Sequence, residues 1–133
     1  MTFPTRHVSV SISRSVPAVY EFASDPANLP KWASGLSRST TITHSENSWL
    51  IDSPMGQVKV RFADRNSLGV IDHEVTLPSG ERVYNPLRVV PNGTGSEVTF
   101  TIFRRSGESE SDFDRDSQTV LRDLQKLKAL LET

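Results

Sequence analysis

The stretch VSVSISRSVPAVYEFASDPANLPKWASGL, residues 8–36, carries the signals of one strand followed by two short helices. Apolar residues alternate with serine from position 8 to 12, the period of two that is typical of a strand with one buried face. Ser15 followed by Pro17 predicts the start of a helix, because serine caps a helix N-terminus and proline fits its first turn. The Asp-Pro pair at 25–26 predicts a second start, because proline cannot occupy the interior of the helix before it.

Between residues 37 and 105 the chain has the composition of strands separated by turns. Six stretches are predicted as strands: 40–45, 48–53, 56–64, 69–77, 81–90 and 96–105. Turn residues fall in the gaps, and one turn is expected at Glu46-Asn47. The short gaps leave no room for the helical crossovers of a parallel sheet. The pattern therefore predicts an antiparallel meander and argues against a parallel nucleotide-binding sheet.

The last segment, residues 109–132, predicts a long amphipathic helix. Its apolar residues recur at intervals of three, four and seven and form one stripe over about six turns: Phe113, Val120, Leu124, Leu127 and Leu131. A sheet with one apolar face needs cover, and this helix is the long element with a matching stripe. We therefore predict a single α+β domain over residues 1–133. A curved antiparallel sheet wraps around the C-terminal helix, and two short helices follow the first strand.

Composition argues against several classes of protein. With 35% apolar residues the chain can bury one core, and the absence of cysteine rules out disulfides, thiol nucleophiles and cysteine-ligated metals. The 15 Lys and Arg balance 16 Asp and Glu without a long run of either sign, which argues against nucleic-acid binding. No stretch approaches the ~20 apolar residues of a membrane span, and residues 1–13 lack the apolar core of a signal peptide. We expect a cytoplasmic protein.

A metal site is not expected either. His7, His44 and His73 lie on separate predicted strands, and no pair of histidines has the short spacing that brings two ligands together on one element.

The opening residues also resemble a known group of proteins. The apolar VY-x-F helix followed by DP-x-N-x-x-x-W resembles the START/Bet v 1-like (SRPBCC) superfamily, particularly its bacterial polyketide cyclase or dehydrase members. The order of elements agrees over nearly the whole chain. The resemblance implies a helix-grip fold with a deep, mostly apolar cavity between sheet and last helix, which opens near the short helices. It also implies binding of an apolar or aromatic small molecule. The group ranges from lipid carriers and hormone receptors to cyclases and co-chaperone domains, so the fold alone does not choose among them.

The predicted strand 69–77 carries the first candidate site residue. If Ile71 faces the core, alternation places His73 on the same face and puts Asp72 and Glu74 on the solvent face. An imidazole in the cavity could act as a general acid or base, because its pKa lies near neutrality. A lone histidine on a half-buried strand is also commonly a hydrogen-bonded structural residue. Both interpretations stay open.

The predicted strand 81–90 carries the second candidate site residue, Asn85. Alternation places Asn85 toward the cavity, and Tyr84 and Arg88 on the other face, unless a bulge at Pro86 resets the register. Asn85 is a candidate catalytic or ligand-binding amide, or a structural amide of the sheet. Arg88, if turned inward, could pair with a carboxylate or an enolate through two hydrogen bonds. If it faces outward, it is one partner of a surface ion pair.

Aromatic residues from several elements are expected to line the cavity together with these polar groups. Rings that face a shared cavity would give an apolar ligand a large contact area, whereas core packing is the more common explanation for any single ring. Trp32 is the exception, because the resemblance implies that this tryptophan lies near the cavity mouth. The predicted ligand-binding set is Trp32, Trp49, Phe62, His73, Asn85, Arg88, Phe100 and Phe113.

Three functions remain open. The first is binding of a small hydrophobic or aromatic ligand, with no cofactor. The second is a cofactor-free cyclase or dehydratase, in which His73 is the acid or base and Asn85 or Arg88 stabilises an enolate. The third is an interaction module with a filled core. A strand edge near the N-terminus could also support a homodimer.

Overall fold

The computed structural model describes residues 1–38, 42–45 and 48–133, and its order of elements follows the prediction. The elements are β1 (Thr5–Ile12), α1 (Val16–Ala23), the 3-10 turn η1 (Pro26–Asn28), α2 (Leu29–Trp32), β2 (Ile42–Ser45), β3 (Ser48–Ser53), β4 (Gly56–Phe62), β5 (His73–Thr76), β6 (Arg82–Asn85), β7 (Leu87–Asn92), β8 (Gly95–Phe103) and α3 (Glu110–Leu131). The predicted helix-grip fold is confirmed. The turn expected at Glu46-Asn47 lies outside the described residues.

The helices begin where the capping residues predicted. The Ser15 hydroxyl accepts a hydrogen bond from the backbone N–H of Ala18, at 3.3 Å, at the start of α1. The Asp25 carboxylate accepts one from the N–H of Ala27, at 3.0 Å, and starts η1 before α2. The Ser109 hydroxyl caps α3 in the same way. Local side-chain chemistry therefore fixes each of these boundaries.

The strands form two antiparallel sheets instead of one. The first has the order β1-β8-β7 and the second the order β2-β3-β4-β5-β6. The division falls at Pro86, in the middle of the predicted strand 81–90, because proline has no N–H to donate to a sheet. The Pro86 carbonyl accepts a hydrogen bond from Thr101 on β8, at 2.9 Å. The chain thus passes from one sheet to the other at this residue.

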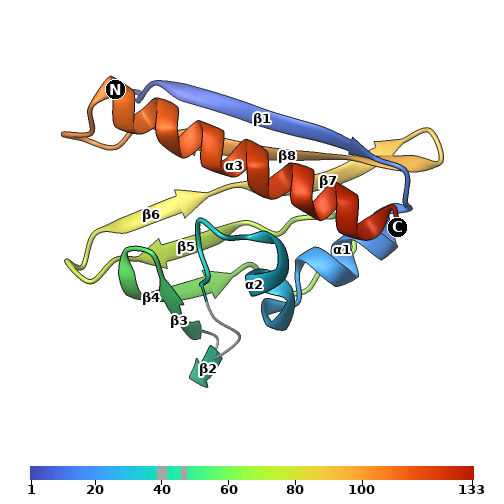
Figure 1. Ribbon diagram of the computed structural model, residues 1–133, viewed down its shortest axis with the longest axis horizontal. Helices are drawn as coiled ribbons and strands as arrows, with labels where there is room; N and C mark the ends of the chain where they lie inside the picture. The colour runs from blue at the N-terminus through green and yellow to red at the C-terminus, as the bar shows by residue number, and fades with distance from the viewer. Residues whose placement is uncertain (39–41, 46–47) are drawn as a thin grey trace.

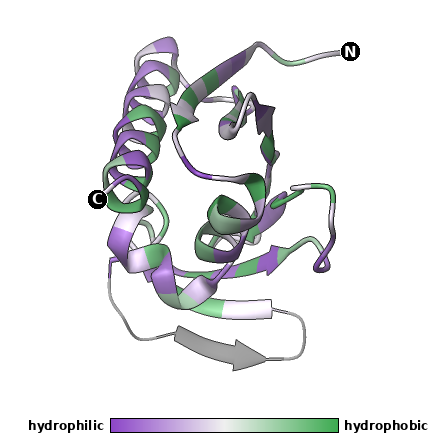
Figure 2. Cartoon of the chain, turned by 90° about the vertical axis from the view of Figure 1, so that its right-hand side faces the viewer, coloured by the Kyte–Doolittle hydropathy of each residue, from purple (hydrophilic) through white to green (hydrophobic). Residues whose placement is uncertain are grey.

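Helix α3 lies across the sheets and packs its apolar stripe against them. Figure 1 shows α3 running in front of β7 and β8 and alongside β1, with β4, β5 and β6 farther down the curved wall. Hydrophobic and hydrophilic residues alternate along α3 in Figure 2, as expected for a helix with one buried face. The predicted stripe residue Val120 is half-buried, and the other four are buried: Phe113, Leu124, Leu127 and Leu131.

Gly69, in the loop between β4 and β5, makes a close backbone contact with β7 of the first sheet. Its carbonyl accepts a hydrogen bond from the N–H of Val89 on β7, at 2.9 Å, and its φ is +76°. A β-carbon at this position would lie 2.1 Å from the carbonyl oxygen of Val89. Both the left-handed backbone and the close approach therefore require glycine.

Asp72 is 5% exposed, so the expectation that this residue is exposed to solvent is wrong. The carboxylate accepts hydrogen bonds from the Tyr84 hydroxyl at 2.7 Å, the Leu87 N–H at 2.9 Å and the Arg88 guanidinium at 2.9 Å. Burial pushes the pKa of Asp72 up, but the bonds from Arg88, Tyr84 and Leu87 outweigh it and hold the pKa below its ordinary value. The carboxylate, one residue before β5, ties this part of the chain to β6 and β7 beside Pro86. Strand alternation correctly predicted that the Asp72 side chain points away from the cavity. It could not predict that Tyr84 and Arg88 cover the carboxylate on the outer face.

Tyr84 and Arg88 lie on this outer face, so the bulge that would have turned Arg88 inward does not occur. Within the described residues, no helix has the length and apolar character needed to cross a membrane.

Candidate functional site

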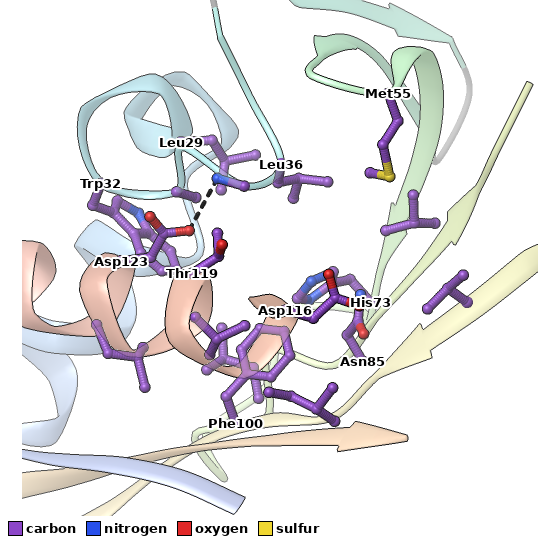
Figure 3. Close-up of a pocket in the computed structure, with 18 of the residues that line it drawn as sticks. Leu29, Trp32, Leu36, Met55, His73, Asn85, Phe100, Asp116, Thr119 and Asp123 are labelled. Atoms are coloured by element: carbon purple, nitrogen blue, oxygen red, sulfur yellow. Dashed lines mark hydrogen bonds between the residues drawn. The ribbon is translucent and has the colours of Figure 1, made fainter. Parts of the chain in front are cut away.

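A cavity of about 180 Å³ lies between the short helices, α3 and the inner face of the sheets. Figure 3 shows it with α2 and α3 on one side and the strands on the other. Five predicted ligand-binding residues line it: Trp32, Phe62, His73, Asn85 and Phe100. Most of the remaining lining is aliphatic, including Leu29, Leu36, Val75, Val83, Leu87 and Ile102. The site is therefore an apolar cavity that contains a few polar groups.

His73 lies between two aromatic rings on the strand side of the cavity. Its ring centroid is 5.3 Å from that of Phe62 and 5.8 Å from that of Phe100. The Nδ1 atom is 3.0 Å from the carbonyl oxygen of Ile71, which can only accept, so Nδ1 carries the proton. Burial lowers the pKa of His73, against the opposing effects of the Ile71 carbonyl and the Asp72 charge. The imidazole is therefore neutral at neutral pH, with a lone pair on Nε2.

Asn85 is the cross-strand neighbour of His73. The two residues are paired in the register of β5 and β6, and both side chains line the cavity. Residues opposite each other on antiparallel strands have β-carbons about 4.5–5.5 Å apart, so one small polar group can contact both side chains. The pair forms a polar spot on the strand wall.

Helix α3 contributes a second polar region, where Asp116 lines the cavity. Burial, a hydrogen bond to Glu108 and the negative charge of that residue raise the pKa of Asp116 to about 7. Burial also pushes the pKa of Glu108 up, but the bonds from Asp116 and from the N–H of Arg105 bring it below its ordinary value. The two carboxyl groups thus share a proton near the end of the cavity where Arg105 lies.

Asp123, two turns farther along α3, anchors the loop after α2. One carboxylate oxygen accepts hydrogen bonds from the N–H and the hydroxyl of Ser34, at 3.2 and 2.6 Å, and the other accepts from the N–H of Gly35 at 3.0 Å. A β-carbon on Gly35 would lie 2.8 Å from Thr119, so the loop approaches the helix closely. Asp123 therefore positions the short-helix side of the cavity.

Trp32 is 4% exposed and covers the same side. Its indole Nε1 is buried and has no hydrogen-bond partner among the described residues. The ring thus supplies contact area for a ligand, and its N–H is a hydrogen-bond donor without an acceptor among the described residues.

Three residues of the predicted set lie away from the cavity. Arg88 is bound to Asp72 on the outer face. Phe113 is buried under the guanidinium of Arg6, which lies 4.4 Å from the ring centroid. Trp49 pairs with Val60 across β3 and β4 and packs against the core beyond the cavity lining. The expectation that these three line the cavity is therefore corrected.

The sequence matches a family model over residues 5–132, and the family is described as polyketide cyclase / dehydrase and lipid transport. The protein belongs to this family. The bacterial cyclase-like resemblance of residues 8–36 is thereby confirmed. No curated protein sequence gives a significant match.

Solved structures similar to this family member share its fold at low sequence identity. DynU16, a protein in the dynemicin biosynthetic locus, has 16% identity and a TM-score of 0.76 over 97% of this chain and 47% of its own, so the chain spans about half of DynU16. A Bacillus halodurans protein has 14% identity and a TM-score of 0.74, with 99% and 100% of the two chains covered. The Aha1 dimer from Colwellia psychrerythraea has 14% identity and a TM-score of 0.74, with 97% and 96% covered. These similarities establish the helix-grip fold.

In this family member, two acidic residues of α3 that were not predicted as site residues also line the cavity. Asp116 and Asp123 are seven residues apart, and Asp123 adjoins the stripe residue Leu124. A carboxylate beside an apolar stripe was the available signal. Among the described residues, no group of three or more histidine or acidic side chains is placed to hold a metal ion.

Proposed function

We propose that the chain binds a small, mainly apolar molecule with one or two aromatic rings in this cavity. The observation that carries the proposal is the cavity itself, which has aromatic residues on both walls and a mostly aliphatic lining. A buried apolar cavity of about 150 Å³ is enough to hold benzene, so about 180 Å³ suits a ligand of this class. Family membership supports the same proposal. The interaction-module alternative expects a filled core, and the cavity gives it no support.

Ligand binding is tested first by native mass spectrometry of the freshly purified protein, followed by denaturing extraction of any bound small molecule. A titration with naphthalene, followed by protein NMR, then measures the affinity for a defined apolar probe. The proposal is contradicted if no small molecule co-purifies with the protein and naphthalene does not bind.

Trp32→Ala is expected to weaken naphthalene binding about 30-fold, because truncating a buried aromatic anchor typically costs about 2 kcal/mol or more. Trp49→Ala is the matched control, since it removes the same side chain outside the cavity lining. Thermal unfolding of both variants shows whether each still folds. Equal losses of affinity in the two folded variants would count against Trp32 as part of the binding site.

A second candidate function is a cofactor-free cyclase or dehydratase, and the state of His73 favours it. A neutral imidazole held through Nδ1 presents a lone pair that could remove a proton next to a carbonyl group. The Asp116 carboxyl, with a pKa raised to about 7 by burial and by Glu108, could return a proton near neutral pH. Both side chains line the cavity, and the Asn85 amide could stabilise an enolate there.

The enzyme alternative predicts that the protein speeds exchange of the α-protons of 2-tetralone for deuterium, which NMR follows directly. His73→Phe is expected to lower this rate at least about 100-fold, because general-base catalysis contributes about 10²–10⁴-fold. Phenylalanine keeps an aromatic ring between Phe62 and Phe100. An equal exchange rate in the wild type and in the variant would leave ligand binding as the function.

A homodimer stays a prediction. β1 is an edge strand of the three-stranded sheet, which is the kind of surface that such a dimer would pair.

A further inference from the structure

The imidazole of His73 offers the cavity a hydrogen-bond acceptor that the protein itself does not use. Because Nδ1 donates to the Ile71 carbonyl, the free lone pair is on Nε2 at the far tip of the ring. Within the part of the chain that the structure describes, Nε2 has no hydrogen-bond partner. Figure 3 shows the ring among the residues around the cavity, close to Asn85. A ligand can therefore satisfy this acceptor only with a hydrogen-bond donor.

Asn85 supplies the complementary group. Its amide has no hydrogen-bond partner among the described residues, and its backbone is paired with that of His73. A hydroxyl group both donates and accepts, so it can donate to His73 Nε2 and accept from the Asn85 side-chain N–H. A ketone or an ether oxygen cannot do the first, and a hydrocarbon can do neither. The pair thus discriminates by the presence of a hydroxyl group.

The charges around the cavity argue against an anionic ligand. Arg105 is the single Lys or Arg among the described lining residues, and its guanidinium is bound to Glu81 at 3.2 Å. Two acidic residues line the cavity, Asp116 and Asp123. Asp116 is hydrogen-bonded to Glu108, and both carboxylate oxygens of Asp123 accept hydrogen bonds from the loop after α2. A buried carboxylate without a counter-ion is strongly disfavoured. A fatty acid anion would find no unpaired cation here.

We propose that the ligand is a neutral hydroxylated aromatic molecule, a phenol or an enol, whose hydroxyl group donates to His73 Nε2 and accepts from Asn85. This inference rests on the proposed binding function and narrows it to one chemical class. It makes His73 and Asn85 the specificity-determining residues of the strand wall, whether or not a reaction follows.

The test compares four probes that share one ring system: naphthalene, 2-naphthol, 2-methoxynaphthalene and 2-naphthoate. At neutral pH, 2-naphthol is expected to bind about three- to tenfold more tightly than 2-methoxynaphthalene, the range for one net hydrogen bond. 2-Naphthoate is expected to bind more weakly than naphthalene. In the wild type, the ¹⁵N resonance of His73 Nε2 should move upfield with 2-naphthol and stay in place with 2-methoxynaphthalene. This NMR readout does not depend on any variant folding.

Two variants assign the preference to its residues. In His73→Phe, 2-naphthol is expected to lose its advantage over 2-methoxynaphthalene. Asn85→Leu should weaken 2-naphthol and 2-methoxynaphthalene alike relative to naphthalene, because both oxygens accept from the amide, and should leave the Nε2 shift in place. If naphthalene binds but 2-naphthol has no advantage and no effect on Nε2, this inference is overturned and the binding function stands. If 2-naphthoate binds most tightly, the neutral class is likewise overturned. If no probe binds, both proposals fail together.

Discussion

Gly69→Ala is expected to lower the free energy of unfolding by about 4 kcal/mol, the largest effect of any substitution considered for this chain. Two costs add. A non-glycine residue at a φ of +76° is strained, and the new β-carbon would lie 2.1 Å from the carbonyl oxygen of Val89, which belongs to the backbone of β7 and cannot rotate away. The contact between the β4–β5 loop and β7 must therefore open. Urea unfolding followed by circular dichroism measures the loss.

Gly107→Ala is the matched control for this prediction. Gly107 has a similar φ of +82°, but a β-carbon there would meet no atom within 4 Å. It should cost only the backbone strain, about 1 kcal/mol or slightly more. If the two alanine variants are equally stable, the close approach of Gly69 to Val89 does not contribute to the destabilisation by Gly69→Ala.

Asp72→Ala is expected to lower the free energy of unfolding by about 3 kcal/mol, because it removes a buried acceptor from three donors at once. The Leu87 N–H is the most costly of the three, since it is buried and the adjacent Pro86 offers no alternative pairing. Arg88→Ala removes only the exposed partner, whose side chain is 57% accessible, and should cost less than about 1 kcal/mol. Equal losses in Asp72→Ala and Arg88→Ala would show that the ion pair, and not the buried carboxylate, holds the junction.

Acid should produce a related loss of stability in the wild type. The hydrogen bonds from Arg88, Tyr84 and Leu87 outweigh burial and keep the pKa of Asp72 below its ordinary value of 3.8. The stabilisation is therefore fully present above this ordinary value and is lost as the pH falls through the lower, folded-state pKa. In Asp72→Asn this part of the acid dependence should be absent when unfolding is measured between neutral pH and about pH 2. An unchanged acid profile in Asp72→Asn would show that other carboxylates dominate.

Much of the fold could be predicted because its signals are local. Ser15, Asp25 and Ser109 begin their elements through hydrogen bonds to residues two or three positions away, and such contacts can be inferred from spacing. The apolar stripe of residues 113–131 likewise follows from helical geometry alone. The division into two sheets was not predicted, because it depends on which strand Pro86 meets across the structure.

The candidate site was predicted in part, for the same physical reason. Alternation gave the correct face for His73 and Asn85, since a strand has a fixed period of two. It could not show that Asp72 would be covered by Tyr84 and Arg88, because burial depends on partners as well as direction. Alternation also could not distinguish an aromatic ring that lines the cavity from one that packs in the core. Phe113 was predicted to line the cavity, but it packs under Arg6. The roles proposed for His73 and Asn85 remain predictions.

The pairing of β1 with β8 has a consequence for how the chain is made. Thr5 lies opposite Phe103 and Ile12 opposite Ser96, so β1, the earliest of the described strands, pairs with β8, the latest of them. At about 5–20 residues per second, β1 waits roughly 5 to 20 seconds for its partner, with an apolar face and a free edge. An apolar face and an unpaired edge are the features through which an incompletely folded strand self-associates. The soluble yield of this protein should therefore depend on the speed of translation downstream of residue 12, as well as on the stability of the finished fold.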